Sequence, residues 1–182
     1  MMKVVIVGPC GVGKSTVAKF LANRANTPYL DFDEIGIQDM QKRKGQISPF
    51  SVSGLNFMQS IPIIIPNTTS AQFVLDIGGD TVFRQNADNY KRLAQVIWLK
   101  ETYTSSIVIL TAQNDILRKR FISTKNRSDY EFDEIWQNWT DISEPHWKKC
   151  GDIFIDTSFL TINEIIGRIG INSIDMPSKN KC

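Results

Sequence analysis

Short apolar runs alternate along this chain with stretches whose apolar positions repeat at helical spacing. The runs are rich in β-branched residues, which is typical of strands buried on both faces, and the stretches between them predict amphipathic helices. The predicted strands cover residues 3–7, 29–32, 73–77, 107–110 and 153–155, and the predicted helices cover residues 14–24, 86–103, 132–142 and 162–169. Because strands that alternate with helices form parallel sheets, we expect a three-layer α/β/α fold around a central five-stranded parallel sheet.

One of these segments allows two interpretations. Residues 96–99 could form a strand, whereas the spacing of Leu93, Val96, Ile97 and Lys100 suits a helix. We favour the helix because a stronger strand pattern follows at once at residues 107–110.

Two other segments interrupt the alternation. The stretch from residue 36 to residue 72 contains several glycines and prolines, and we interpret it as short helices and loops that form a substrate-binding insertion. The polar, basic stretch that begins at Arg118 predicts a small lid over residues 118–131. We expect one domain over residues 1–174 and a flexible tail over residues 175–182.

Composition excludes several classes of protein. The chain has 182 residues, of which 42% are hydrophobic and 22% charged, and its net charge of +2 gives no sign of a nucleic-acid-binding surface. No apolar stretch approaches the roughly 20 residues that cross a bilayer, and the start is too short for a signal peptide. The three cysteines, Cys10, Cys150 and Cys182, lack the spacing of a metal site. We therefore expect a cytoplasmic protein, monomeric, without nucleic-acid or membrane partners.

The strongest chemical signal lies between the first predicted strand and the first predicted helix. Residues 8–15, Gly-Pro-Cys-Gly-Val-Gly-Lys-Ser, match every fixed position of the P-loop pattern G-x-x-x-x-G-K-[ST]. In such a loop the backbone N–H groups surround the phosphates, the lysine reaches the β- and γ-phosphates, and the following hydroxyl holds Mg²⁺. The candidate residues for binding the phosphates of ATP are Gly8, Cys10, Gly11, Val12, Gly13, Lys14, Ser15 and Thr16.

Carboxylates follow two of the other predicted strands. Asp33 is our candidate for orienting an attacking hydroxyl or accepting its proton, with capping of the following helix as the alternative. Asp31 is a candidate Mg²⁺ ligand acting through water, or else a structural hydrogen-bond acceptor. Asp76 ends an apolar run, as a Walker B carboxylate does, and a buried carboxylate needs a metal or a donor. We expect Ser15, Asp31 and Asp76 to form the metal site.

A glycine pair follows Asp76 in the sequence. Gly78 and Gly79 would let a substrate approach the backbone closely. Asp80 would contact a cationic or polyhydroxyl acceptor, or is a plain turn residue. Trp136, Trp139 and Trp147 are interpreted as core packing residues, with stacking of one of them on a flat substrate as the alternative. His146 is interpreted as a surface or packing residue.

Several segments together resemble shikimate kinase and its small-molecule kinase relatives among the P-loop phosphotransferases. The resemblance rests on the P-loop, on the D-x-D at residues 31–33, on the strand and glycine turn at residues 74–80, and on residues 109–120 and 154–157. It implies that Arg120 stacks on the adenine and that Arg127, seven residues later, acts from the lid. The family has a small residue at the position of Asp76, so the resemblance does not support a metal role there.

The sequence also departs from that family on the acceptor side. Asp80 replaces the third glycine of a triple-glycine motif, and Ser143-Glu144-Pro145-His146-Trp147 stands where the family has R-x-P-x-Y. We find no match to the family's other carboxylate-binding arginine between residues 36 and 72. Since arginine forks supply bidentate recognition of carboxylates, we expect a neutral or cationic acceptor in place of shikimate.

Together these patterns predict an ATP- and Mg²⁺-dependent kinase that transfers the γ-phosphoryl group to a hydroxyl of a small molecule, with Lys14, Asp33 and Arg127 as catalytic residues. A nucleoside or nucleotide kinase on the same scaffold is one alternative. A nucleotide-binding regulatory NTPase that transfers nothing is another, as is a kinase fold retained only for binding.

Overall fold

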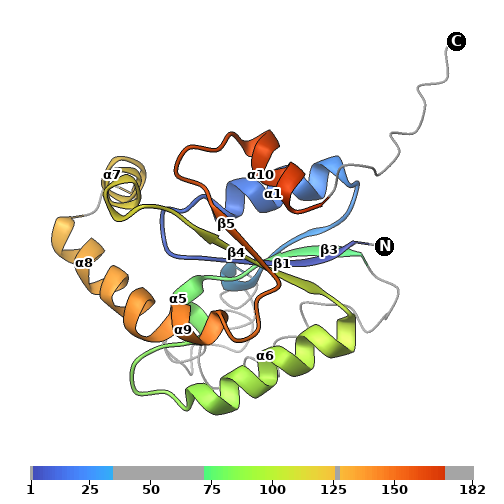
Figure 1. Ribbon diagram of the computed structural model, residues 1–182, viewed down its shortest axis with the longest axis horizontal. Coiled ribbons are helices and arrows are strands. Elements are labelled where there is room, and N and C mark those ends of the chain that lie inside the picture. The colour runs from blue at the N-terminus through green and yellow to red at the C-terminus, as the bar shows by residue number, and fades with distance from the viewer. Residues whose placement is uncertain (1, 35–71, 126–127, 171–182) are drawn as a thin grey trace, which may run out of the picture.

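A five-stranded, all-parallel sheet forms the centre of the protein (Figure 1). The computed structural model describes residues 2–34, 72–125 and 128–170. Its strands are β1 (Lys3–Val7), β2 (Tyr29–Asp31), β3 (Phe73–Asp76), β4 (Ser106–Thr111) and β5 (Ile153–Asp156), in the spatial order β2-β3-β1-β4-β5. The sequence-based expectation of a parallel five-stranded sheet is confirmed, with β1 and its P-loop in the middle.

Helices cover both faces of this sheet, as Figure 1 shows. The described helices are α1 (Lys14–Arg24), α5 (Gly79–Val82), α6 (Asn89–Tyr103), α7 (Asn114–Lys125), α8 (Asp129–Asn138), the π-helix η1 (Trp139–Ser143), α9 (Glu144–Trp147) and α10 (Ile162–Arg168). Helices α1 and α10 lie on one face, and α6 runs along the other.

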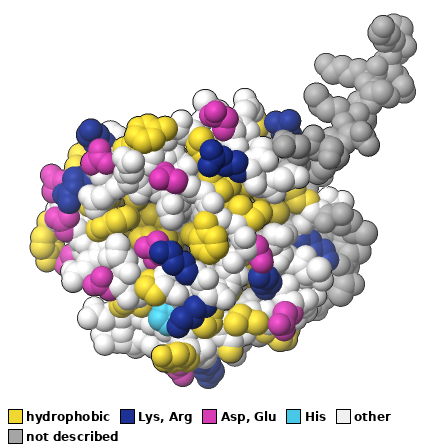
Figure 2. Space-filling view, viewed as in Figure 1, with side chains coloured by type: hydrophobic (Ala, Val, Ile, Leu, Met, Phe, Trp, Pro, Cys, Tyr) yellow, Lys and Arg dark blue, Asp and Glu magenta, His cyan; other side chains and the backbone are white. Residues whose placement is uncertain are grey.

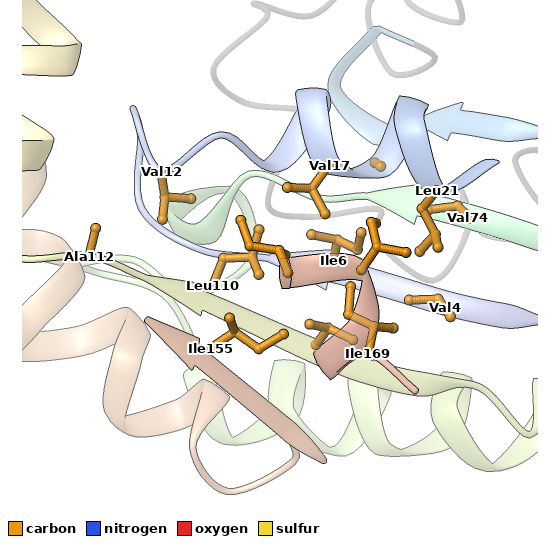
Figure 3. Packing of buried hydrophobic residues seen from close by; sticks show 14 of the residues in the cluster. Val4, Ile6, Val12, Val17, Leu21, Val74, Leu110, Ala112, Ile155 and Ile169 are labelled. Atoms are coloured by element: carbon orange, nitrogen blue, oxygen red, sulfur yellow. The ribbon is translucent and has the colours of Figure 1, made fainter. Parts of the chain in front are cut away.

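Alternation along each strand builds two separate apolar cores. Val4 and Ile6 of β1 point toward α1 and α10, where they pack with Leu21 in the cluster drawn in Figure 3. Val5 and Val7 point to the opposite face, where α6 and the tryptophans of η1 and α9 cover them. Because side chains of a strand alternate between faces, a strand buried on both sides must be apolar throughout. This explains why the sequence of β1 is an unbroken apolar run after Lys3.

The structure corrects the predicted boundaries in three places. Strand β2 ends at Asp31, because Phe32 already belongs to a helical turn. The basic stretch from residue 118 to residue 125 is part of helix α7. Helix α8 begins at Asp129, earlier than expected, because Ser128 forms a capping box with Glu131. The helical interpretation of residues 86–103 is confirmed by α6, which ends where Thr104 takes a left-handed conformation with φ 50°.

Other predictions fall on parts of the chain that the structure does not describe. Residues 35–71, nearly the whole of the expected insertion, lie outside the described residues, as do residues 126–127 and the tail from residue 171. The division into one domain with an insertion, a lid and a tail therefore stays a prediction. Within the described residues, no helix combines the length and the apolar character needed to cross a membrane. On the face drawn in Figure 2, charged side chains of both signs are interspersed.

The buried face of α1 gives a test of this packing. Leu21 is fully buried, whereas its neighbour Phe20 is 37% exposed. We expect Leu21→Ala to lower the free energy of unfolding by about 2–5 kcal/mol, the usual cost of removing a buried leucine side chain. Phe20→Ala is the matched control and should cost much less. Urea titrations followed by circular dichroism measure both, and equal losses would contradict the assignment of Leu21 to the core.

Candidate functional site

The loop between β1 and α1 has the backbone that a phosphate-binding loop requires. Gly11 and Gly13 take positive φ angles of 83° and 96°, which favour glycine. No side chain in the described part of the chain caps the N-terminus of α1, and its first turn carries no acidic residue. Lys14 folds back over the loop, where its Nζ donates a hydrogen bond to the Pro9 carbonyl at 3.2 Å. The N–H groups at this helix end are therefore left for an anion.

Arg120 of α7 lies against the outer side of the same loop. Its guanidinium donates to the carbonyl and to Oγ1 of Thr157, both at 3.3 Å. The Thr157 hydroxyl in turn lies 3.4 Å from the Val12 carbonyl and 3.1 Å from the Thr111 carbonyl. Thr157 is buried, so it ties Arg120 to the P-loop from the end of β5. Arg120 thus lies beside the P-loop, and its stacking on the adenine stays a prediction.

Two carboxylates lie side by side next to the P-loop, at the ends of β2 and β3. Asp31 is the register partner of Asp76, and Asp76 is also the partner of Ile6 on β1. The Asp76 side chain is only 5% exposed, and its Oδ1 has no hydrogen-bond partner among the described residues. The Tyr29 hydroxyl lies 3.1 Å from Asp31 Oδ2 and 3.4 Å from Asp76 Oδ2.

Burial dominates the electrostatics of these groups. It raises the pKa of Asp76, an effect that nearby Asp31 reinforces and that Ser15 and Lys14 oppose. Burial also raises the pKa of Tyr29, and the charges of Asp76 and Asp31 raise it further, so the phenol stays protonated as a donor. The Ser15 hydroxyl is near enough to favour the ionised form of Asp76, although it makes no hydrogen bond of standard geometry with Oδ1.

Ser15, Asp31 and Asp76 fit a magnesium ion better than a metal caged by protein alone. The described residues contain no group of three His, Cys, Asp or Glu side chains that could hold a metal by themselves. Mg²⁺ usually takes one or two carboxylates and completes its shell with phosphate oxygens and water. An unpartnered buried carboxylate oxygen beside the P-loop hydroxyl is the donor that such an ion needs.

Asp33 lies next to Asp31, between this carboxylate pair and the glycine turn after β3. Its Oδ1 accepts a hydrogen bond from Thr81 Oγ1 at 3.0 Å. Burial by surrounding atoms raises the pKa of Asp33, Thr81 lowers it, and the charge of Asp31 raises it again. Helix capping falls to Asp31, whose Oδ1 accepts from the N–H groups of Asp33 and Glu34, both at 3.1 Å. The Asp33 carboxylate is thus directed by Thr81 and not by a capping bond.

The glycine turn after β3 touches the P-loop directly. A methyl group on Gly79 would lie 2.4 Å from the Gly8 carbonyl oxygen and 2.5 Å from the ring of Trp139. The Trp147 indole donates to the Gly79 carbonyl at 2.9 Å and fixes this peptide. Both tryptophans are buried, which confirms their interpretation as packing residues.

Gly78 lines the side of this turn that faces Asp33. A methyl group on Gly78 would come within 3.0 Å of Asp33 Oδ2. Asp80 is exposed at the start of α5. His146 stacks on Phe83 and contacts the Ile142 carbonyl at 2.7 Å, as a packing residue does.

Two positions where the family resemblance points to arginines remain to be placed, one in the predicted lid and one on the acceptor side. Arg127 lies outside the described residues, so its catalytic role stays a prediction. Ser143, at the position where the related family has arginine, is buried, and its hydroxyl donates to the Phe83 carbonyl at 2.8 Å. The Ser143 side chain therefore makes a structural hydrogen bond inside the fold.

Three residues of the site were missed in the sequence analysis. Tyr29 carried a readable signal, because residues two apart on a strand share a face and Tyr29 precedes Asp31 by two. Thr157 ends the segment 154–157, which is part of the family resemblance given in the sequence analysis. Thr81 carried no signal, since its partner Asp33 is far away in the sequence.

Comparisons with known proteins agree with this geometry. The family model described as shikimate kinase matches residues 10–171. A shikimate kinase of Chromobacterium violaceum is 27% identical over 97% of this chain and 92% of its own length. The structure of shikimate kinase from Acinetobacter baumannii in complex with shikimate superposes with a TM-score of 0.62 at 20% identity, covering 93% of this chain and 91% of the other. A gluconokinase from Sinorhizobium meliloti shares the fold with a TM-score of 0.57 at 15% identity, covering 92% and 88% of the two chains.

The raised pKa of Asp76 leads to a prediction about how the stability of the fold depends on pH. Because the folded pKa lies above the unfolded value, ionised Asp76 destabilises the protein as pH rises through the folded pKa. Asp76→Asn removes this charge and should raise the melting temperature near neutral pH in metal-free buffer. The advantage should disappear below about pH 4, where the carboxyl is protonated in both the folded and the unfolded state.

Thermal unfolding of both proteins between about pH 4 and about pH 8 measures this difference. The same substitution should lower phosphoryl-transfer activity at least about tenfold if Asp76 serves the metal. A variant that is less stable than the wild type at every pH would contradict the destabilising role of the buried charge.

Proposed function

The chain belongs to the shikimate kinase family and is an ATP-dependent small-molecule kinase, and from this premise we propose that it phosphorylates a hydroxyl of an acceptor other than shikimate. The observation that carries this proposal is the side-by-side placement of the P-loop and of the Asp33–Thr81 pair, which are joined through the glycine turn. Asp33 is close enough to Lys14 for the lysine charge to lower the pKa of its carboxyl. The lysine of the phosphate-binding loop and the proposed acceptor-orienting carboxylate therefore lie close to each other.

Each residue on the donor side has a defined task in this proposal. The P-loop N–H groups and the N-terminus of α1 hold the phosphates of ATP. Lys14 leaves the Pro9 carbonyl to neutralise the charge that develops on the transferred group. Arg120, held by Thr157, supports the adenine, and Arg127 closes from the lid. Mg²⁺, when bound at Ser15, Asp31 and Asp76, would neutralise phosphate charge and orient the phosphates for transfer.

On the acceptor side, Asp33 orients the attacking hydroxyl and accepts its proton. Thr81 holds Oδ1 of Asp33, so that Oδ2, which lies near Gly78, faces the acceptor. The raised pKa of Asp33 brings the carboxylate nearer to the range in which a general base works at neutral pH. Gly78 leaves the space beside Oδ2 of Asp33 free of a side chain, and Gly79 holds the turn against the P-loop. The charge of the exposed Asp80 acts on Asp33.

An acceptor without a carboxylate fits this side of the site best. Its described charged groups include Asp33 and Asp80, which repel an acid, and Ser143 supplies a neutral buried hydroxyl where relatives place an arginine. A neutral or amino-bearing polyol would instead find hydrogen-bond acceptors. We also propose a cytoplasmic monomer that works without nucleic-acid or membrane partners.

Lys14 gives the most direct test of the donor side. Lys14→Ala should lower kcat about a hundredfold to a thousandfold, the range for loss of one charge-stabilising donor, and should leave the fold intact. Lys148→Ala is the control, because Lys148 pairs with Glu144 on α9 away from the P-loop. A coupled ADP-release assay measures activity, and near-normal turnover of Lys14→Ala would overturn its assignment.

A panel of acceptors tests the other side. With ATP and Mg²⁺ present, we expect turnover with a neutral or amino-bearing polyol, and a kcat/KM for shikimate that is about 100-fold lower, which corresponds to about 2.8 kcal/mol. Nucleosides, nucleoside monophosphates and an acceptor-free sample complete the panel. Shikimate as the best acceptor would overturn the acceptor specificity and leave the kinase assignment. Hydrolysis that no acceptor stimulates would favour a regulatory NTPase.

A further inference from the structure

The Tyr29 hydroxyl occupies a position that the phosphoryl-transfer mechanism above does not use. It lies between the carboxylates of Asp31 and Asp76, at 3.1 Å from Oδ2 of the first and 3.4 Å from Oδ2 of the second. These carboxylates sit on neighbouring strands in direct register. One phenolic proton therefore serves two acidic groups that would otherwise repel each other.

The four carboxylate oxygens have unequal surroundings. Oδ1 of Asp31 accepts hydrogen bonds from the N–H groups of Asp33 and Glu34. Oδ2 of Asp31 accepts a hydrogen bond from the Tyr29 hydroxyl. Oδ2 of Asp76 also accepts a hydrogen bond from the Tyr29 hydroxyl. Within the described chain, Oδ1 of Asp76 has no hydrogen-bond partner, although the residue is only 5% exposed. A buried carboxylate oxygen left without a donor calls for a ligand.

From this division of oxygens we infer that Tyr29 is a positioning residue that directs Oδ1 of Asp76 toward the divalent cation, with Asp31 as its support. Asp76 is then the direct carboxylate ligand, and Asp31 acts through Tyr29 and the turn it caps. The inference rests on the proposed function, because the cation is the one that accompanies ATP. It separates two aspartates that the sequence alone places equally close to the metal.

The ring of Tyr29 is held firmly enough for this task. It packs against the core between the sheet and α1, and Lys19 Nζ lies 5.2 Å from the ring centroid. Strand pairing fixes the backbone, since Tyr29 is in register with Val74 on β3. An anchored phenol can hold Asp76 Oδ2 in one direction, and a Mg²⁺ site is sensitive to such orientation because the ion demands near-octahedral geometry.

The test is a comparison of metal affinity among single variants. Tyr29→Phe removes only the hydroxyl, and Tyr90→Phe, on the far side of the sheet on α6, is the matched control. We measure Mn²⁺ binding to the ATP complex by electron paramagnetic resonance, and the Mg²⁺ concentration for half-maximal activity. Calorimetry with ATP in the presence of a chelator reports nucleotide binding without metal.

We expect Tyr29→Phe to weaken metal binding about tenfold, with kcat at saturating Mg²⁺ and metal-free ATP binding within about twofold of the wild type. Tyr90→Phe should match the wild type in every measurement. Asp76→Asn should weaken metal binding more than Asp31→Asn does, which tests the assignment even if Tyr29→Phe folds poorly.

Unchanged or tighter metal binding by folded Tyr29→Phe would overturn the role of Tyr29. Equal losses in Asp31→Asn and Asp76→Asn would overturn the assignment of Asp76 as the direct ligand. Both failures differ from failure of the proposed function, in which the wild type itself would show no metal-dependent ATP binding and no kinase activity.

Discussion

The close contact between the backbones of Gly79 and Gly8 is the constraint on which the site depends. Even one methyl group on Gly79 would come within 2.4 Å of the Gly8 carbonyl oxygen. The contact brings the turn after β3 against the loop after β1, so that the P-loop lies close to the residues proposed to orient the acceptor. Trp147 fixes the Gly79 peptide through its indole N–H, and this bond ties the C-terminal helices to the site. Packing around two buried tryptophans thus fixes the distance between the glycine turn and the P-loop.

The same sheet that creates the site also places a charge where burial opposes it. Strands β1 and β3 must be apolar on both faces, and Asp76 comes at the end of such a strand, in register with Ile6. A carboxylate there costs stability unless a donor or a cation compensates for the lost water. Tyr29, Ser15 and Lys14 each offset part of that cost, and the unpartnered Oδ1 shows that the compensation is incomplete. Under the proposed function, this incomplete compensation would contribute to the binding energy of a cation.

Much of this arrangement could be predicted because it depends on short-range spacing. The P-loop needs fixed positions of Gly8, Gly13, Lys14 and Ser15 within one loop, and the parallel sheet follows from apolar runs that alternate with helices. Asp31 and Asp76 could be grouped because parallel strands end at the same edge of a sheet. The start of α8 could also have been predicted, because Ser128 and Glu131 have the spacing of a capping box. The predicted start at residue 132 followed the apolar positions alone.

What could not be predicted depends on contacts between distant parts of the chain. Thr81 meets Asp33 across 48 residues, and no local pattern marks a threonine as the partner of an aspartate. The division of labour between Asp31 and Asp33 depends on where β2 ends, a boundary that hydrophobic patterning does not resolve to one residue. Which oxygen of Asp76 is left open follows only from the position of a phenol on the neighbouring strand.

Membership of the family constrains the two sides of the site to different degrees. The donor side is built from backbone N–H groups, a lysine and hydroxyls whose roles follow from phosphate chemistry, so any ATP-dependent member must keep them. The acceptor side is built from side chains that can change while the fold persists. Ser143 illustrates this, because a serine that bonds to the Phe83 carbonyl satisfies the fold without offering a charge to a substrate. Under the proposed function, the chemistry of Asp33, Thr81 and Asp80 is therefore the guide to the acceptor.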